Sequence, residues 1–192
     1  MGAWHVAGAR PIRAYDFIDS VLIRFNPTDA SAVATPLTPG THLSTTDTSK
    51  DEIEEMANRL YRELVGALAW LALGTRPDIA FAASSFVRFG HNPGRAHWEA
   101  AKRVLRYPNG TNGWRLTLGG TTPQVAAFAD ADWDSHRDDR RSFGAYVIKV
   151  GDGVVSWKSK KQSYVALSST EAEYMELWPG VKGVGMVIRF PP

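Results

Sequence analysis

Residues 143–157 read FGAYVIKVGDGVVSW, and this stretch decides the fold of the second half of the chain. Its hydrophobic period is two, which is the period of a strand whose alternate side chains lie on opposite faces. The Gly-Asp-Gly sequence at 151–153 contains an Asp-Gly pair, a strong signal for a two-residue β-hairpin. The stretch therefore predicts two antiparallel strands, Phe143–Val150 and 154–157.

Further strands are predicted on both sides of this hairpin. Residues 114–118 and 125–129 precede it and residues 163–167 follow it, all with the same period of two. The sequence Ser-Ser-Thr-Glu at 168–171 then predicts the start of a helix, because a hydroxyl residue followed by acids satisfies and stabilises the first turn. The second half is therefore expected to be an antiparallel meander followed by one helix.

The first half of the chain has helical periodicity instead. The expected helices are Ala14–Phe25, 51–73, 78–89 and 95–107, with Gly74 ending the second and Pro108 ending the last sharply. Residues 26–50 are rich in Pro, Thr, Ser and Gly, so we expect an extended connector that lies over a neighbouring element. Helices followed by a meander and a final helix define an α+β fold.

The composition of the 192 residues is that of an ordinary globular protein. An apolar share of 44% argues against wholesale disorder, and the absence of cysteine excludes disulfide scaffolds and thiolate zinc sites. No run approaches the roughly 20 apolar residues of a membrane span. The first 13 residues lack the apolar centre of a secretory signal. We therefore expect an intracellular protein of the cytoplasm or nucleus, without a membrane partner.

Charge is unevenly distributed although the net charge is only +2. Residues 47–63 are acidic, whereas 95–115 and 137–161 are basic, which permits contact with nucleic acid. The basic side of the helix at 95–107 is either an ordinary solvated face or a phosphate-contacting one. The basic residues beside the predicted strands either discourage edge-to-edge aggregation or hold a hybrid duplex by its phosphates. The candidate nucleic-acid-binding residues are Arg95, Lys102, Arg106, Arg140, Arg141, Lys158, Lys160 and Lys161.

Two groups of acids are candidates for metal chemistry. Asp-Ala-Asp at 130–132 ends a predicted strand, and Glu-Ala-Glu at 171–173 lies in the helix after the hairpin. Two-metal hydrolysis of phosphodiesters needs several carboxylates around cations about 4 Å apart, and magnesium prefers such oxygen ligands. A strand-end Asp and a Glu early in a helix could converge in this way. Acids are also common at strand ends and helix starts, so the spacing alone leaves both interpretations open.

Several long motifs, in order, resemble the Pol polyproteins of copia-type retrotransposons. The motifs are YRELVGAL at 61–68, LGTRPDIA at 73–80, NPGRAHW at 92–98, AKRVLRY at 101–107, ADADW at 129–133, DDRRS at 138–142, VSWKSKKQ at 155–162 and VALSSTEAEY at 165–174. The similarity runs from about residue 11 to residue 177, which is most of the chain.

The resemblance implies a thumb and connection region of a reverse transcriptase over residues 1–120 and a truncated ribonuclease H-like domain over 121–192. It places the first metal ligand of that domain on Asp130 and the helix ligand on Glu173, with Glu171 facing elsewhere. Magnesium is the implied cofactor and an RNA–DNA hybrid the implied partner.

The departures from the family pattern limit the expected activity. The chain has no Tyr-x-Asp-Asp motif, so polymerase activity is not expected. No aspartate follows Asp152, so two of the four ribonuclease H carboxylates are expected to be missing and magnesium to be held weakly. Pro179 and several glycines should keep the Glu173 helix short, since a Pro inside a helix costs about 3 kcal/mol. The remaining alternatives are a residual nucleic-acid-binding module, or ribonuclease H activity completed by another chain.

Overall fold

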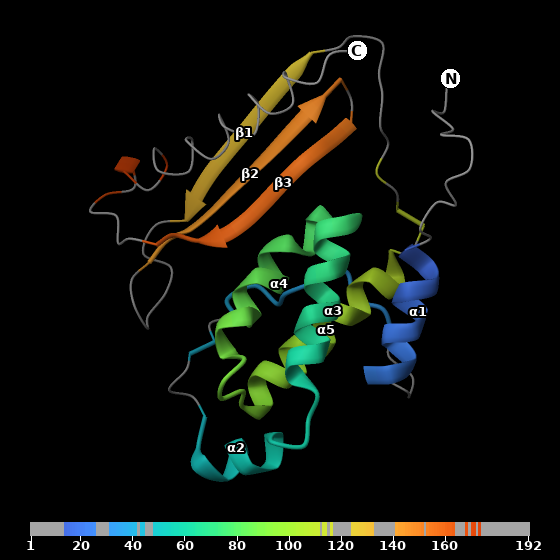
Figure 1. The fold of residues 1–192 in the computed structure, drawn as a ribbon, viewed down its shortest axis with the longest axis vertical. Coiled ribbons are helices and arrows are strands. Elements are labelled where there is room, and N and C mark those ends of the chain that lie inside the picture. Colours follow the sequence, from blue (N-terminus) through green and yellow to red (C-terminus); the bar gives the residue numbers. More distant parts are fainter. Residues whose placement is uncertain are drawn as a thin grey trace.

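A helical layer lies against one face of a three-stranded antiparallel sheet in the computed structural model (Figure 1). The structure describes residues 14–25, 31–41, 43–44, 48–111, 113–114, 116, 124–132, 141–151, 153–163, 168, 170–171 and 173. The elements are α1 (Ala14–Phe25), α2 (Lys50–Met56), α3 (Tyr61–Gly74), η2 (Pro77–Ile79), α4 (Ala80–Phe86), η3 (Val87–Phe89), α5 (Arg95–Gly110), β1 (Val125–Asp132), β2 (Phe143–Val150) and β3 (Gly153–Lys161). The predicted α+β class is confirmed.

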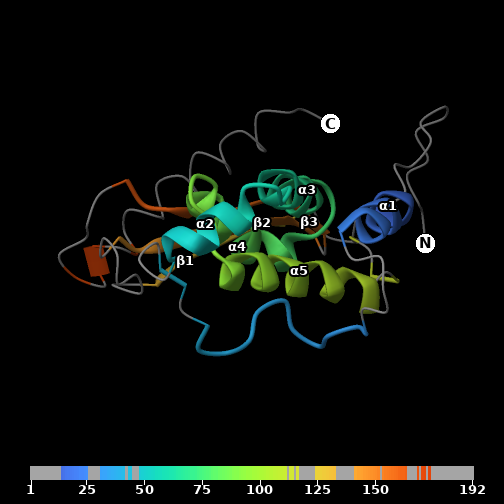
Figure 2. The same cartoon turned by 90° about the horizontal axis from the view of Figure 1, so that it is seen from below.

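The main hydrophobic core lies between α1, α3, α4 and α5. Leu64, Leu68 and Leu71 recur at helical spacing along α3, are fully buried, and belong to the same core cluster as Ile18 of α1 and Val104 of α5. Figures 1 and 2 both show α1, α3 and α5 side by side. Each buried Leu or Ile side chain contributes about 1.5–3 kcal/mol relative to an exposed one, so this core is the main source of stability of the helical layer.

The connector before α2 lies over α5, as predicted (Figure 2). The Arg106 side chain donates hydrogen bonds to the carbonyl and hydroxyl oxygens of Ser31, at 2.8 and 2.9 Å. Ala32 approaches the end of α5 so closely that a Cβ on Gly110 would lie 2.6 Å from the Ala32 Cβ. Glycine at 110 therefore permits this contact.

The prediction of one continuous helix over 51–73 is wrong, because residues 57–60 separate α2 from α3. Met56 and Tyr61, on either side of the break, are both buried. The Tyr61 hydroxyl donates to the carbonyl oxygen of Phe86 at 3.1 Å, and burial raises the pKa of this tyrosine. Tertiary packing of these two side chains thus overrides a local composition that favours helix.

The prediction that Pro108 ends the preceding helix is also wrong, because α5 continues to Gly110. A proline removes one backbone donor, and so close to the helix end the loss is limited to the last turn. Thr111 compensates from beyond the helix: its backbone N–H and its hydroxyl both donate to the carbonyl oxygen of Tyr107, at 3.2 and 2.9 Å.

The predicted hairpin is confirmed, with β2 matching its predicted bounds and β3 extending to Lys161. Val150 pairs with Gly153, so the loop consists of residues 151–152, and Gly151 has a positive φ of 60°. Residues 114, 116 and 163 belong to no strand, which contradicts the two outer strand predictions at those positions. The other residues of those stretches, 165 and 167 among them, lie outside the described part, as do the residues after 173.

The sheet is fastened to the helical layer by two contacts on one face. The indole Nε1 of Trp157 donates to the carbonyl oxygen of Ala72 at 2.7 Å, in the last turn of α3. The rings of Phe143 and Phe81 meet edge to face, with centroids 5.3 Å apart. Because the last carbonyl groups of a helix lack partners within it, the Trp157 bond also satisfies one of them.

Arg76 holds the turn between α3 and η2. Its side chain is almost fully buried and donates to both carboxylate oxygens of Asp78, at 2.7–3.2 Å, and to the hydroxyl of Thr111 at 2.5 Å. Its guanidinium also lies 5.3 Å from the centroid of the Tyr107 ring. One side chain therefore joins this turn to the end of α5. Within the described ranges, no helix is long and apolar enough to cross a membrane.

Replacing Trp157 with Phe should destabilise the protein by about 1–2 kcal/mol, since it removes the bond to Ala72 and leaves a carbonyl group without its partner. Chemical denaturation followed by circular dichroism measures the free energy of unfolding. The matched control is Trp114→Phe, at a side chain that is 63% exposed. Equal stability of the two variants would contradict the role of Trp157.

Replacing Arg76 with Lys should cost about 2 kcal/mol, because an ammonium group cannot reproduce the paired bonds to Asp78 together with the bond to Thr111. The control is Arg24→Lys, whose ion pair with Glu63 is about half exposed and should change stability by less than about 0.5 kcal/mol. Equal decreases in the thermal unfolding temperature for both variants would contradict the stabilising role of the Arg76 hydrogen bonds.

Candidate metal and nucleic-acid sites

Asp130 lies on β1 and faces the helical layer. The register places Asp130 opposite Ala145 on β2, and Ala145 opposite Ser159 on β3. Residues 143 and 145 share one face of β2, and Phe143 packs on Phe81, so the Asp130 side chain projects to the same side. The Asp130 side chain remains exposed because β1 is the strand farther from the helices (Figure 1).

A hollow of about 280 Å³ lies between the sheet and the helices beside Asp130. Its walls include the apolar side chains of Phe81 and Phe143, and Trp157 lies along it. Asp130 and Ser159 are the polar residues on the helix-facing side of the strands that line it. The hollow therefore presents one carboxylate beside apolar surface, which differs from the several converging oxygen ligands of a magnesium centre.

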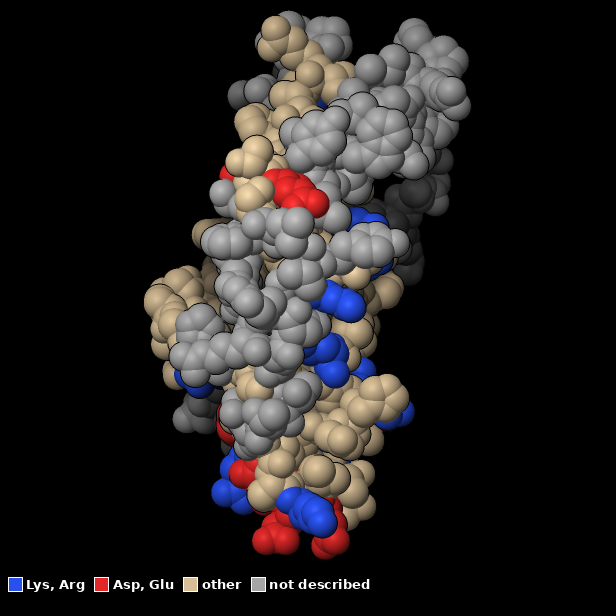
Figure 3. All heavy atoms as spheres, turned by 90° about the vertical axis from the view of Figure 1, so that its left-hand side faces the viewer, with Lys and Arg blue, Asp and Glu red and all other residues tan. Residues whose placement is uncertain are grey.

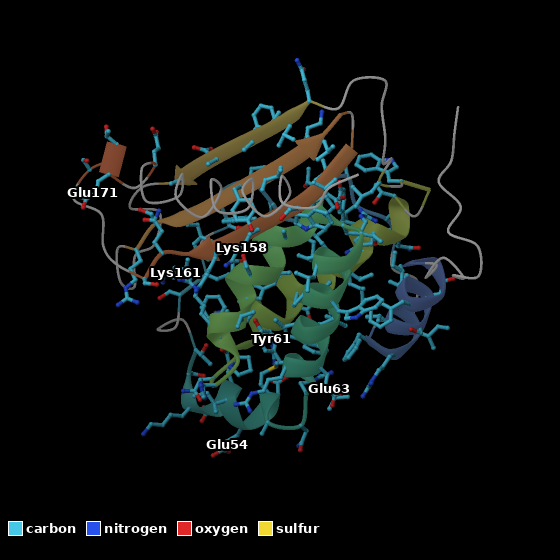
Figure 4. The ribbon with its side chains drawn as sticks, turned by 45° about the horizontal axis from the view of Figure 1, so that its top comes forward. Glu54, Tyr61, Glu63, Lys158, Lys161 and Glu171 are labelled. Carbon is cyan, nitrogen blue, oxygen red and sulfur yellow. The ribbon has the colours of Figure 1, made fainter. Side chains whose placement is uncertain are left out.

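Glu171 and Glu173 both lie in helical backbone and are exposed. The Ser168 hydroxyl accepts a hydrogen bond from the backbone N–H of Glu171 at 3.1 Å, which is the predicted helix cap. Figures 1 and 2 show this short helical segment apart from the three strands, and Figure 4 shows Glu171 at the periphery. The structure thus gives Glu173 a helical position without bringing it into a cluster.

The described carboxylates do not fit a two-metal centre. Among the residues the structure describes, no group of three or more His, Cys, Asp or Glu side chains could hold a metal ion. The side chain of Asp132 lies outside the described part. The predicted roles of Asp130 and Glu173 as magnesium ligands therefore remain predictions.

The three basic candidates on α5 all have partners within the chain. Arg95 pairs with Glu55 at 2.5 Å, and the hydrogen bond and charge of Glu55 raise the pKa of Arg95. Lys102 pairs with Glu99 at 2.8 Å, and Arg106 binds the connector as described above. A phosphate group would have to compete with these contacts. Contact between α5 and nucleic acid remains a prediction.

The basic candidates on the sheet divide between its two faces. Lys158 and Lys160 are exposed and alternate with Trp157, so they project from the face opposite to the helices. Lys161 lies on the other face, at the end of β3 (Figure 4). Arg141 is exposed just before β2, and Arg140 lies outside the described residues. Asp130 and the two exposed lysines therefore point to opposite sides of the sheet.

Figure 3 shows one side of the molecule, with Lys and Arg side chains spread along its middle. Acidic side chains lie at its lower end, where Figure 1 places α2, beside further Lys and Arg side chains, and another acidic group lies in its upper part. The acidic character of α2 comes from Asp51, Glu52, Glu54 and Glu55. Acidic and basic side chains are therefore interspersed on this surface, and the charge asymmetry expected from the sequence stays a prediction.

Sequence reasoning assigned no role to Arg76, which proved central to the packing. The signal was present in the spacing Arg-Pro-Asp at 76–78, where the ring of Pro77 restricts the turn and Asp78 can accept from a nearby guanidinium. The other hydrogen-bond partner, Thr111, lies 35 residues away. No local pattern could have indicated that partner.

Two similar proteins are transposon polyproteins. The chain is 44% identical over 161 residues to the Retrovirus-related Pol polyprotein from transposon TNT 1-94 of Nicotiana tabacum, and 41% identical over 161 residues to that from transposon RE1 of Arabidopsis thaliana. These alignments cover 83% and 82% of the chain. The chain belongs to the copia-type retrotransposon Pol family. It spans only 12% and 10% of the lengths of those two Pol polyproteins.

A shorter relative matches this chain over most of its own length. The Secreted RxLR effector protein 161 of Plasmopara viticola is 46% identical over 124 residues, which are 64% of this chain and 87% of that protein. No family model matches the chain, and no solved structure matches it. The Pol assignment therefore rests on sequence similarity to curated relatives.

Proposed function

We propose that this chain is the part of a copia-type Pol polyprotein that joins the reverse transcriptase to a ribonuclease H-like part, and that it does not cut an RNA–DNA hybrid by itself. The observation that supports this proposal is the sheet that carries Asp130, which is fastened to the helical layer through Trp157 and Phe143. Such a junction would keep a hydrolytic site in fixed relation to the helices.

The lack of turnover follows from the number of carboxylates. Cleavage of a phosphodiester by two metal ions requires both ions to be held so that the attacking and leaving oxygens are stabilised together. Asp130 contributes one acid from β1 and Glu173 contributes one from a helix, and the described residues form no larger metal-binding group. We therefore assign Asp130 and Glu173 as two ligands of a site whose other ligands come from elsewhere in Pol.

Incubating the 192-residue polypeptide with a labelled RNA–DNA hybrid and magnesium should give no cleavage above the rate with magnesium alone. A longer Pol polypeptide that contains this segment should cut the hybrid, and Asp130→Asn within it should abolish cutting. The control is Asp19→Asn, at an exposed acid on α1, which should leave cutting unchanged. Cleavage by the shorter polypeptide that Asp130→Asn removes would overturn the proposal.

A second role, binding of nucleic acid, is favoured by the exposure of Lys158 and Lys160 on β3. Residues i and i+2 of a strand lie about 6.5–7 Å apart, which is close to the spacing of successive phosphates along a nucleic-acid strand. Phosphate contacts require only positive charge and reach, so these two lysines could hold a duplex without reading its sequence.

Removing both lysines (Lys158→Ala with Lys160→Ala) should weaken hybrid binding and reduce the slope of log K against log salt by about two, which is one for each lost phosphate contact. The control is Lys50→Ala, which removes an exposed lysine at the acidic end of the molecule and should leave the slope unchanged. Fluorescence anisotropy at several salt concentrations measures the slope. Binding that does not respond to salt would exclude this role.

A further inference from the structure

The connector between α1 and α2 is held in place on both sides of Thr35. Before it, Arg106 of α5 donates to the carbonyl and hydroxyl oxygens of Ser31 at 2.8 and 2.9 Å. Val33 and Leu37, two residues to either side, are partly buried and pack against the main hydrophobic core. Figure 2 shows this segment beside α5. The position of Thr35 relative to α5 is therefore set by neighbouring contacts on both sides.

Arg103 of α5 reaches Thr35 with one edge of its guanidinium, and that edge is only partly used. Its Nη2 donates to the Thr35 hydroxyl at 3.3 Å, which is slightly longer than a typical N–H···O bond. Its Nε, which lies on the same edge, is buried and has no hydrogen-bond partner among the described residues. No carboxylate in the described part of the chain forms an ion pair with Arg103. A buried donor without an acceptor is unfavourable, so an additional acceptor on this edge would be stabilising.

Two other arginines show what the same edge binds when it is fully used. Nε and Nη2 of Arg76 both donate to the carboxylate of Asp78, at 2.7–3.2 Å. Nε and Nη2 of Arg106 donate to a backbone carbonyl oxygen and a hydroxyl oxygen. Two parallel N–H groups match two oxygens of a carboxylate or a phosphate. The edge of Arg103 therefore fits a phosphate, and the atom that already lies against it is the Thr35 hydroxyl oxygen.

Thr35 is also accessible to a modifying enzyme. It is exposed, and it lies in a part of the connector that forms neither helix nor strand. Pro36 follows directly, and threonine followed by proline is the acceptor motif of proline-directed protein kinases. Exposed connecting segments are the parts of a fold that another enzyme reaches most readily.

We propose that Thr35 is a phosphorylation site and that Arg103 binds its phosphate, which fastens the connector to α5. A kinase transfers the γ-phosphoryl group of a nucleoside triphosphate. The Thr35 oxygen forms a bond to phosphorus, the bond to the departing nucleoside diphosphate breaks, and the hydroxyl proton passes to a base of the kinase. The phosphate adds a charge of about −1.5 to −2 at pH 7 and three acceptor oxygens, of which two take the Nε and Nη2 donors of Arg103. This inference does not depend on the proposed role in Pol.

Incubating the whole polypeptide with ATP and a proline-directed kinase should place a phosphate on Thr35, which mass spectrometry of its peptides locates. Thr35→Val removes the acceptor hydroxyl at nearly constant side-chain shape and should remove this phosphopeptide. A kinase reaction that leaves Thr35 unmodified in the folded polypeptide would overturn the proposal.

Hydrogen exchange tests whether Arg103 binds the phosphate. In a polypeptide made with phosphothreonine at position 35, the backbone amides of residues 31–41 should exchange at least ~10-fold more slowly than in the unmodified one, because charge-assisted bonds hold the connector closed. In the Arg103→Gln background the phosphate should give no slowing. Arg103→Lys keeps the charge but loses the paired N–H groups, so it should retain only part of the effect. Slowing that survives Arg103→Gln in full would contradict the binding of the phosphate by Arg103, and circular dichroism confirms that each variant is folded.

Two matched controls separate this contact from general effects on the connector. Arg106→Gln removes a different anchor of the same segment, so it should speed exchange with and without the phosphate but leave the effect of the phosphate intact. Phosphothreonine at position 38 adds the same charge where no described arginine donates to the Thr38 side chain, and it should give no slowing. Equal slowing from position 38 would show a general effect of charge and refute the assignment.

Two other phosphate sources could occupy the same edge of Arg103. Inorganic phosphate at millimolar concentration should not slow exchange in the unmodified polypeptide, because it lacks the covalent attachment that raises its local concentration. An RNA–DNA hybrid should likewise leave the exchange of residues 31–41 unchanged. Slowing by either ligand that Arg103→Gln abolishes would assign the edge to that ligand, and the proposal for Thr35 would then be wrong.

Discussion

The guanidinium of Arg76 reaches from the turn after α3 to the end of α5, and the position of the sheet depends on this contact. Its bonds to Asp78 and Thr111 are made from a buried position, where an unpaired charge would be costly. The carbonyl oxygen of Ala72 and the ring of Phe81, which receive the sheet, lie on either side of this turn. A change in the turn would therefore displace both supports of the sheet at once.

The periodicity and turn motifs of the sequence predicted the elements that are stabilised by interactions between residues close together in the chain. The bounds of α1 and β2 were predicted to the residue, because helical spacing and a hairpin signal act within a few positions. Two predictions failed where distant partners decide the outcome. The break before Tyr61 depends on packing against Phe86, and the continuation of α5 past Pro108 is accompanied by bonds from Thr111 that Arg76 holds in place. A prediction from a short stretch of sequence cannot include partners that lie so far apart along the chain.

In the candidate site, too, the strands could be predicted from the sequence, but the contacts between distant residues could not. The sequence placed Asp130 at the end of a strand and the basic residues beside the next two strands. The structure extends β1 beyond Asp130 and extends β3 over Lys158, Lys160 and Lys161. Which face each side chain takes could not be predicted, because it depends on Trp157 turning toward Ala72. Because side chains alternate along a strand, this contact places Asp130 on the helix-facing side of the sheet and Lys158 on the opposite face. The family assignment needed no such information, since the order of long motifs was sufficient for it.

The strand that carries the candidate metal ligand Asp130 is also an outer strand of the described sheet. β1 carries Asp130, and among the described strands it pairs with β2 alone and contains no lysine. Any strand laid beside β1 would lie about 4.8 Å from it and would bring its own side chains next to Asp130. A strand bearing carboxylates would pair with the backbone of β1 and would also supply oxygen ligands beside Asp130.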